Sequence, residues 1–177
     1  MTDHDSGDAP GPVPAGPALG AGDAREITAL YAEYCASVDA GDFARFARLF
    51  SRGTWLGMPG SEVEEWMHRN VLTYGGATYT RHRVHGITLT PGSSPDEVHG
   101  TCAIEVTQQF PDEQAVLVTD NTYADRFRRH DGLWQFASRA ITRRLPGDDS
   151  RHRRPGGRLA PPDGDEEGSS TCGSSTA

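Results

Sequence analysis

Apolar residues recur at helical spacing in residues 25–38, the first stretch of the chain with a strong pattern. They predict an amphipathic helix whose buried face consists of Ile27, Leu30, Tyr31, Tyr34, Cys35 and Val38. Asp39 ends this helix, and Gly41 supplies the left-handed residue that commonly closes a helix. Asp42 is placed to cap a second helix, whose apolar face consists of Phe43, Phe46, Leu49 and Phe50. The domain is therefore predicted to open with two helices joined by a tight corner.

A third helix is predicted after a short apolar run at residues 54–58, which is itself read as a strand or the rim of a pocket. Ser61 and Glu64 have the spacing of a capping box at its start. One face of this helix collects Val63, Trp66, Met67, Asn70 and Val71. His68 lies outside that face, so we expect it to be exposed to solvent.

From residue 80 onward the pattern changes from a helical to a strand-like period. The apolar parity of residues 80–90 reverses at Gly86, and a bulge there would bring four side chains to one inner face: His82, Val84, Ile87 and Leu89. Residues 98–107 alternate cleanly, with an inner face of Val98, Gly100, Cys102, Ile104 and Val106. These two stretches predict neighbouring antiparallel strands joined by a turn at residues 91–96.

The last two strands, residues 115–128 and 133–143, form a hairpin around an Asp-Gly turn. Their inner faces are predicted to hold Tyr123, Asp125 and Phe127, and Trp134, Phe136 and Ser138. Arg139 and Asp125 suit an ion pair between the strands or a contact between subunits. Helices followed by antiparallel strands predict an α+β domain in which helices cover one face of a curved sheet, with an apolar pocket at the mouth.

Both ends of the chain lack the apolar residues that a core requires. Gly, Ala, Pro and Asp dominate residues 1–23, and Arg, Pro, Gly and acidic or Ser residues dominate 146–177. We therefore predict disordered tails around one domain at residues 24–145. That domain holds 15 acidic residues and 13 arginines, so its charge is −2 and the tails carry −6 of the total −8. This balance argues against nucleic-acid and membrane partners.

The residue inventory excludes several kinds of chemistry. The sequence has no lysine, so Schiff-base catalysis and a P-loop are excluded. Three scattered cysteines suit neither a disulfide framework nor a zinc site, and the histidines and acids lack metal-ligand spacing. No Gly-rich phosphate loop follows a strand, so we expect neither cofactor nor metal. A signal peptide and a membrane-spanning segment are not expected either, which predicts a cytoplasmic location.

Asp39 is the first candidate for chemistry. At about 100° per residue it lies on the shoulder of the apolar face beside Cys35, at the edge of the core. The negative end of the helix dipole and partial burial both predict a raised pKa for Asp39, toward the range useful to a general base. The alternative is a partly solvated corner residue without chemistry.

Five features, in this order, resemble the SnoaL-like branch of the NTF2-like superfamily. They are the helix with Tyr34 and Asp39, the Gly41-Asp42 corner, the Arg81-His82 pair, the Tyr123-x-Asp125 step, and the Trp134-x-Phe136-x-x-Arg139 ending. The resemblance covers residues 24–144 and implies a cone-shaped, cystatin-like α+β fold with a curved antiparallel sheet. The superfamily includes scytalone dehydratase, ketosteroid isomerase, polyketide cyclases, limonene-epoxide hydrolase and non-catalytic subunits, so the fold alone does not assign an activity.

Within the superfamily the chain is most similar to the scytalone-dehydratase pattern, in which a helix-end aspartate orients a strand histidine that acts as acid and base. The resemblance assigns these roles to Asp39 and His82. A carboxylate bonded to one imidazole nitrogen raises the basicity of the other, whereas the alternative for His82 is a histidine satisfied within the sheet. Cys102 stands near the position of the dehydratase's second histidine, and Val38 replaces a tyrosine. The dehydratase mechanism is therefore not carried over whole.

The resemblance also implies a set of substrate-binding candidates: Tyr31, Tyr34, Trp55, Trp66, Cys102 and Tyr123. Any of the three tyrosines could supply a replacement hydroxyl, whereas Cys102 is better explained as a small buried thiol.

Together these features predict a cofactor-free lyase or isomerase that dehydrates, cyclises or isomerises a small apolar, polyketide-like metabolite of secondary metabolism. A non-catalytic binding or assembly module and an epoxide hydrolase with Asp39 as base are the alternatives. By analogy we expect a homodimer or homotrimer.

Overall fold

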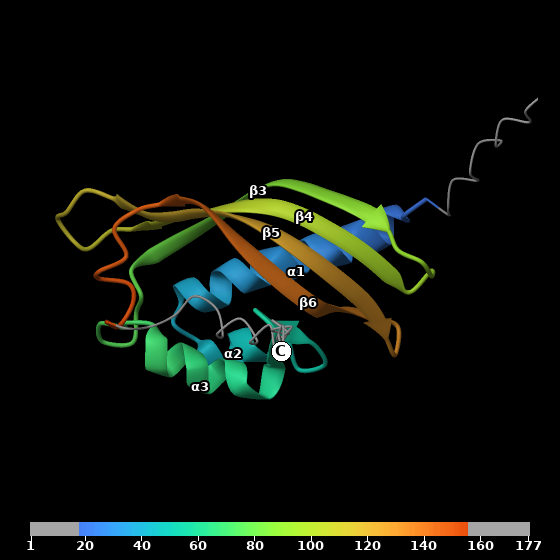
Figure 1. Cartoon of the computed structure of the whole chain (residues 1–177), viewed down its shortest axis with the longest axis horizontal. Helices are drawn as coiled ribbons and strands as arrows, with labels where there is room; N and C mark the ends of the chain where they lie inside the picture. Colours follow the sequence, from blue (N-terminus) through green and yellow to red (C-terminus); the bar gives the residue numbers. More distant parts are fainter. Residues whose placement is uncertain (1–17, 156–177) are drawn as a thin grey trace, which may run out of the picture.

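The computed structural model describes residues 18–155, in which three helices lie on one side of a curved sheet (Figure 1). The helices are α1 (Ala21–Asp39), α2 (Phe43–Arg48) and α3 (Gly60–Asn70). Asp42 caps α2 by accepting a hydrogen bond from the backbone N–H of Arg45 at 2.9 Å, and Gly41 has a φ of 70°, as predicted. The predicted capping box is wrong, because α3 begins directly after Pro59 and no side chain caps it.

Six strands form one sheet in the order β2-β1-β6-β5-β4-β3. Their bounds are β1 (Thr54–Trp55), β2 (Met58–Pro59), β3 (Thr80–Pro91), β4 (Glu97–Gln108), β5 (Val116–His130) and β6 (Leu133–Pro146). The four long strands pair antiparallel in chain order, whereas β1 pairs parallel with β6 and antiparallel with β2. The arrangement confirms the predicted α+β cone, with the apolar run at residues 54–58 forming a very short hairpin.

A bulge in β3 places its inner residues as the sequence predicts. The pairing of β3 with β4 shifts register between His85 and Thr88, and Gly86 has a φ of 64°. His82 and Ile87, on either side of the bulge, are both partly buried, whereas His85 is exposed. The side chain of His82 therefore reaches the interior of the cone.

A second bulge, in β6, was not predicted. Phe127 pairs with Phe136, but the preceding residue of β5 pairs with Ser138, so Ala137 is the extra residue. Ser138 is consequently only partly buried, and Arg139 takes the inner position with 1% of its surface exposed. The prediction that Ser138 shares the inner face with Phe136 is wrong for this reason.

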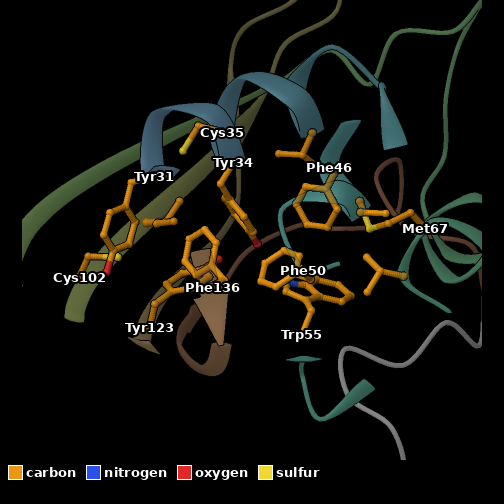
Figure 2. Packing of buried hydrophobic residues seen from close by; sticks show 14 of the residues in the cluster. Tyr31, Tyr34, Cys35, Phe46, Phe50, Trp55, Met67, Cys102, Tyr123 and Phe136 are labelled. Carbon is orange, nitrogen blue, oxygen red and sulfur yellow. The ribbon is translucent and has the colours of Figure 1, made fainter. Parts of the chain in front are cut away.

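The core between the helices and the sheet is mainly aromatic (Figure 2). Phe50 stacks on Phe136 with ring centres 5.0 Å apart, and Tyr31 meets Phe127 edge-on at 5.6 Å. Burying each such side chain contributes about 1.5–3 kcal/mol, and each ring pair adds about 0.5–1.5 kcal/mol. The aromatic residues of α1 and α2 thus fix the helices to the sheet.

A buried ion pair crosses this core. The Nε and Nη2 atoms of Arg139 donate to the two carboxylate oxygens of Asp125 at 2.7 and 2.9 Å, and neither side chain is exposed. The hydroxyl of Tyr31 donates to the same carboxylate at 2.7 Å, and the guanidinium lies 4.1 Å from the ring centre of Tyr34. The two residues face each other on β5 and β6, which confirms the predicted ion pair between the strands.

The chain does not leave the domain at the end of β6. Residues 147–154, here called the closing segment, run from the sheet to the end of α3, and Figure 1 shows this path in orange to red. Gly147 donates its N–H to the carbonyl of Val118 at 3.0 Å, and Leu72 donates to the carbonyl of His152 at 2.9 Å. A further backbone hydrogen bond of 2.9 Å joins the segment to the last residue of α3.

The folded part of the chain therefore continues past the boundary that the sequence analysis placed at 145. The remainder of the two predicted tails, residues 1–17 and 156–177, lies outside the described residues. None of the helices in the described part is long and apolar enough to cross a membrane.

Candidate active site

Asp39 and His82 meet at the inner wall of the cone. Oδ1 of Asp39 lies 2.6 Å from Nδ1 of His82, while Oδ2 accepts the backbone N–H of His82 at 2.9 Å. The hydroxyl of Thr80 donates to Oδ1 at 2.9 Å. The end of α1 and the start of β3 thus hold one carboxylate against one imidazole through three hydrogen bonds.

This contact decides the protonation of the imidazole. A carboxylate only accepts hydrogen bonds, so in the neutral ring Nδ1 of His82 carries the proton and Nε2 carries the lone pair. The side chain of His82 is 7% exposed, and that of Asp39 is 24% exposed. His82 therefore presents a basic nitrogen that is largely shielded from bulk water.

The predicted rise in the pKa of Asp39 is wrong. Burial does push the pKa of this carboxyl upward, but the hydrogen bonds and the charge of His82, together with the Thr80 hydroxyl, bring it below its usual value. Asp39 thus stays ionised at neutral pH. It is suited to orient His82 and to stabilise its imidazolium, and it is poorly suited to act as a base itself.

A cavity of about 70 Å³ lies in front of His82. Most of its wall is apolar: Val38, Phe46, Trp55, Trp66, Met67, Val71, Val106, Val118 and Ile141. The polar part of the wall consists of Tyr34, His82, Thr119, Asn121 and Tyr123, together with Arg143 of β6 and Asp149, His152 and Arg153 of the closing segment. An apolar hollow with a few converging polar groups is the usual form of a small-molecule site.

The structure divides the predicted substrate-binding residues into two groups. Four of them line the cavity: Tyr34, Trp55, Trp66 and Tyr123. Tyr31 and Cys102 are buried and do not line it. Tyr31 is committed to the Asp125 carboxylate and lies beside Cys102, at the far end of the core from Trp55 (Figure 2).

The tyrosines that line the cavity are neutral groups. Burial raises the pKa of Tyr34 and of Tyr123, and burial together with Asp125 raises the pKa of Tyr31. Burial likewise raises the pKa of Cys102 to about 12, so its thiol stays protonated. At neutral pH Tyr34 and Tyr123 therefore keep their hydroxyl protons and can act as hydrogen-bond donors.

Sequence reasoning missed the residues that complete the cavity from its C-terminal side. These are Arg143 of β6 and, from the closing segment, Asp149, His152 and Arg153. Asp149 pairs with Arg143 at 3.3 Å and with Arg153 at 3.2 Å. Residues 147–154 have no apolar periodicity, so the sequence pattern gave no signal for them. Backbone hydrogen bonds and ion pairs hold them to the domain in place of apolar packing.

Comparison with known proteins places this architecture in a family. A family model described as a SnoaL-like domain matches residues 21–140. The chain belongs to the SnoaL-like family. No curated protein matches this SnoaL-like chain by sequence.

Solved structures share the fold of the SnoaL-like domain. Aln2 from a Streptomyces species superposes with a TM-score of 0.59 at 19% identity, covering 71% of this chain and 93% of that one. A hexachlorocyclohexane dehydrochlorinase (LinA) type 2 gives 0.57 at 22% identity, covering 80% and 95%. A candidate scytalone dehydratase from Novosphingobium aromaticivorans gives 0.58 at 18% identity, covering 77% and 94%.

These similarities show a cystatin-like, NTF2-like fold, and proteins with dehydratase-type names are among those that share it. In the described residues no group of three or more His, Cys, Asp or Glu side chains is arranged to hold a metal ion. The site itself places an imidazole against an ionised carboxylate in a largely apolar cavity wall, an arrangement that is capable of proton transfer.

Proposed function

We propose that this SnoaL-like domain is a cofactor-free lyase that eliminates water from a small, largely apolar hydroxy ketone, with His82 as acid and base. The observation that carries the proposal is the 2.6 Å contact between Asp39 and Nδ1 of His82 at the wall of an apolar cavity. A carboxylate that fixes the tautomer leaves Nε2 free to accept a proton from a substrate carbon.

The elimination balances without a cofactor. Nε2 of His82 takes a proton from the carbon next to the ketone, and the electrons of that C–H bond form the new double bond. The bond to the neighbouring hydroxyl breaks, and the imidazolium returns the proton to the departing oxygen, so that water leaves. The negative charge of Asp39 stabilises the imidazolium between these two steps.

Elimination is favoured over isomerisation or cyclisation because two of the structural neighbours are named for eliminations, a dehydrochlorinase and a candidate dehydratase. An epoxide hydrolase is less well supported. In the described part of the chain Arg139 pairs with one acid, Asp125, and both are buried away from the cavity.

The size of the cavity constrains how a substrate enters. About 70 Å³ is less than the roughly 150 Å³ of a buried cavity that accommodates benzene, so the cavity has to widen to hold a ring-containing substrate. The closing segment is the part of the wall that follows the last strand, and both backbone hydrogen bonds and the ion pairs of Asp149 with Arg143 and of Arg151 with Glu113 hold it in place. We propose that it lifts to admit substrate and returns to exclude water.

The test is the dehydration of 3-hydroxy-1-tetralone, which loses water and rearranges to the fluorescent product 1-naphthol. The wild type should accelerate this reaction over buffer, and His82→Gln should lose about 10³-fold or more of the acceleration. Asp39→Asn should lose about 10²-fold or more, because the tautomer of His82 is no longer fixed. His85→Gln is the matched control on the exposed face of the same strand and should keep the wild-type rate.

Two results would reject the proposal. One is a His82→Gln variant that reacts as fast as the wild type. The other is a wild type that binds 1-tetralone, which cannot lose water, yet leaves 3-hydroxy-1-tetralone unchanged. The second result would support a ligand-binding module in place of an enzyme.

A further inference from the structure

His152 lies in the closing segment, outside the pair that performs the proposed proton transfer. It lines the same cavity as His82, and the two imidazoles are near enough for the charge of one to affect the pKa of the other. Seventy residues separate them in the sequence, and the path of the closing segment from β5 to α3 brings them together. The cavity thus has a histidine on its sheet wall and another on its closing wall.

The ring of His152 has hydrogen-bonding capacity that the protein does not use. Its Nδ1 is buried and makes no hydrogen bond within residues 18–155. Leaving a buried polar atom without a partner is unfavourable, so such an atom calls for an explanation, and a bound ligand is one. Around it the backbone is fully engaged, because the N–H of His152 donates to Asp149 at 3.0 Å and its carbonyl accepts from Leu72 at 2.9 Å.

The surroundings also fix the charge of this ring. Burial, the neighbouring His82 and Arg153 lower the pKa of His152 to about 4, against the opposing influence of Asp149 and Asp39. At neutral pH the imidazole is therefore uncharged and offers one N–H donor and one acceptor. Such a group matches a neutral oxygen, a carbonyl or a hydroxyl, better than a carboxylate.

We propose that His152 is a substrate-binding residue, whose ring hydrogen-bonds a ketone or hydroxyl oxygen of the ligand on the wall of the cavity that closes over it. This inference rests on the proposed function for the class of ligand, but it concerns binding and does not depend on turnover. Because His152 arrives with the closing segment, the same contact that recognises the oxygen also holds the segment closed.

The experiment compares two bicyclic probes that differ by one oxygen, 1-tetralone and its hydrocarbon counterpart tetralin. Binding is measured in the His82→Gln background, where no proton is transferred, through the fluorescence of Trp55 and Trp66 in the cavity wall. Replacing His152 by Phe should weaken 1-tetralone binding about tenfold and leave tetralin binding unchanged, since one hydrogen bond is lost and the apolar contacts stay.

Two further variants separate recognition from the support of the fold. His152→Gln keeps a donor and an acceptor and should recover part of the affinity for 1-tetralone. His85→Phe makes the same replacement on the exposed face of β3 and should change neither affinity.

The inference is overturned if His152→Phe weakens both probes equally, because His152 would then only support the closing segment. Unchanged affinity for 1-tetralone overturns it as well, as does a parent protein that binds neither probe. Its failure is distinguishable from that of the proposed function. Turnover that depends on His82 with no role for His152 rejects only this inference, whereas selective binding without turnover rejects only the enzyme.

Discussion

Removing the buried carboxylate of Asp125 should destabilise the domain more than any single change on its surface. Asp125→Ala takes away three hydrogen bonds, two of 2.7 and 2.9 Å from Arg139 and one of 2.7 Å from Tyr31. It also leaves a guanidinium that has no exposed surface without its counter-charge.

The magnitude follows from this geometry. Breaking one partner out of a buried ion pair costs about 3–5 kcal/mol, because the remaining charge stays desolvated. The rings of Tyr34 and Tyr123, 4.1 and 4.8 Å from the guanidinium, offset part of this cost by roughly 0.5–2 kcal/mol each. With these offsets the net loss is roughly 2 kcal/mol, which at a urea m-value of about 2 kcal/mol/M moves the unfolding midpoint down by about 1 M.

The assay is urea unfolding followed by tryptophan fluorescence at pH 7. Glu105→Gln is the comparison at an exposed pair, since Arg83 and Glu105 are 58% and 42% exposed, and it should cost about 0.5 kcal/mol or less. The double replacement Asp125→Leu with Arg139→Met should recover most of the lost stability, because no charge is then left buried. A loss below about 1 kcal/mol for Asp125→Ala would refute the reasoning and assign the stabilisation of Arg139 to the aromatic rings.

Three further outcomes are expected. Gly60→Ala should lower the free energy of unfolding in urea by several kcal/mol, because the added Cβ would lie 1.9 Å from the carbonyl oxygen of Phe50. The Cβ of Gly86→Ala meets nothing within 4 Å, so this control should lose only the roughly 1–2 kcal/mol of a positive φ, and equal losses would contradict the prediction. Folding lowers the pKa of Asp39, so the ionised carboxylate stabilises the fold above about pH 4, and this stabilisation is lost as the pH falls through the lower folded value. Asp39→Asn should therefore lose less stability than the wild type below pH 4, and an equal loss would count against the contact of Asp39 with His82. The pKa of His152 falls from about 6.5 when unfolded to about 4, so stability should drop between pH 6.5 and 4 in the wild type and less so in His152→Gln, as thermal unfolding across that range would show.

Most of the architecture could be predicted from the periodicity of apolar residues in the sequence. The apolar positions of α1 and the alternation in β4 are local signals of burial, and the parity reversal at Gly86 located a bulge that the register of β3 confirms. The bulge at Ala137 could not be predicted, because Phe136 and Ser138 keep a regular alternation in the sequence. Only the pairing of β6 with β5 shows the extra residue. Register is a property of two strands, so one strand's pattern could not reveal it.

The site was predictable in part for the same reason. Asp39 and His82 each lie on a recognisable element, and their meeting required only the fold that the resemblance implied. The direction of the pKa of Asp39 depended on the hydrogen bonds from His82 and Thr80, which outweigh burial and which a helix considered alone does not contain. His152 could not be predicted, because composition assigned its surroundings to a tail.

The closing segment has a practical consequence for where this protein can be cut. The family match ends at residue 140 and the last strand ends at Pro146, so both positions are obvious places to truncate the chain. A domain truncated at either position keeps every helix and most or all of the sheet. Such a protein would keep Asp39 and His82 but would lack the side of the cavity that Asp149, His152 and Arg153 line. If the trimmed protein were inactive in the dehydration assay, the missing cavity wall would be a sufficient reason. That result would not show that the full chain lacks activity.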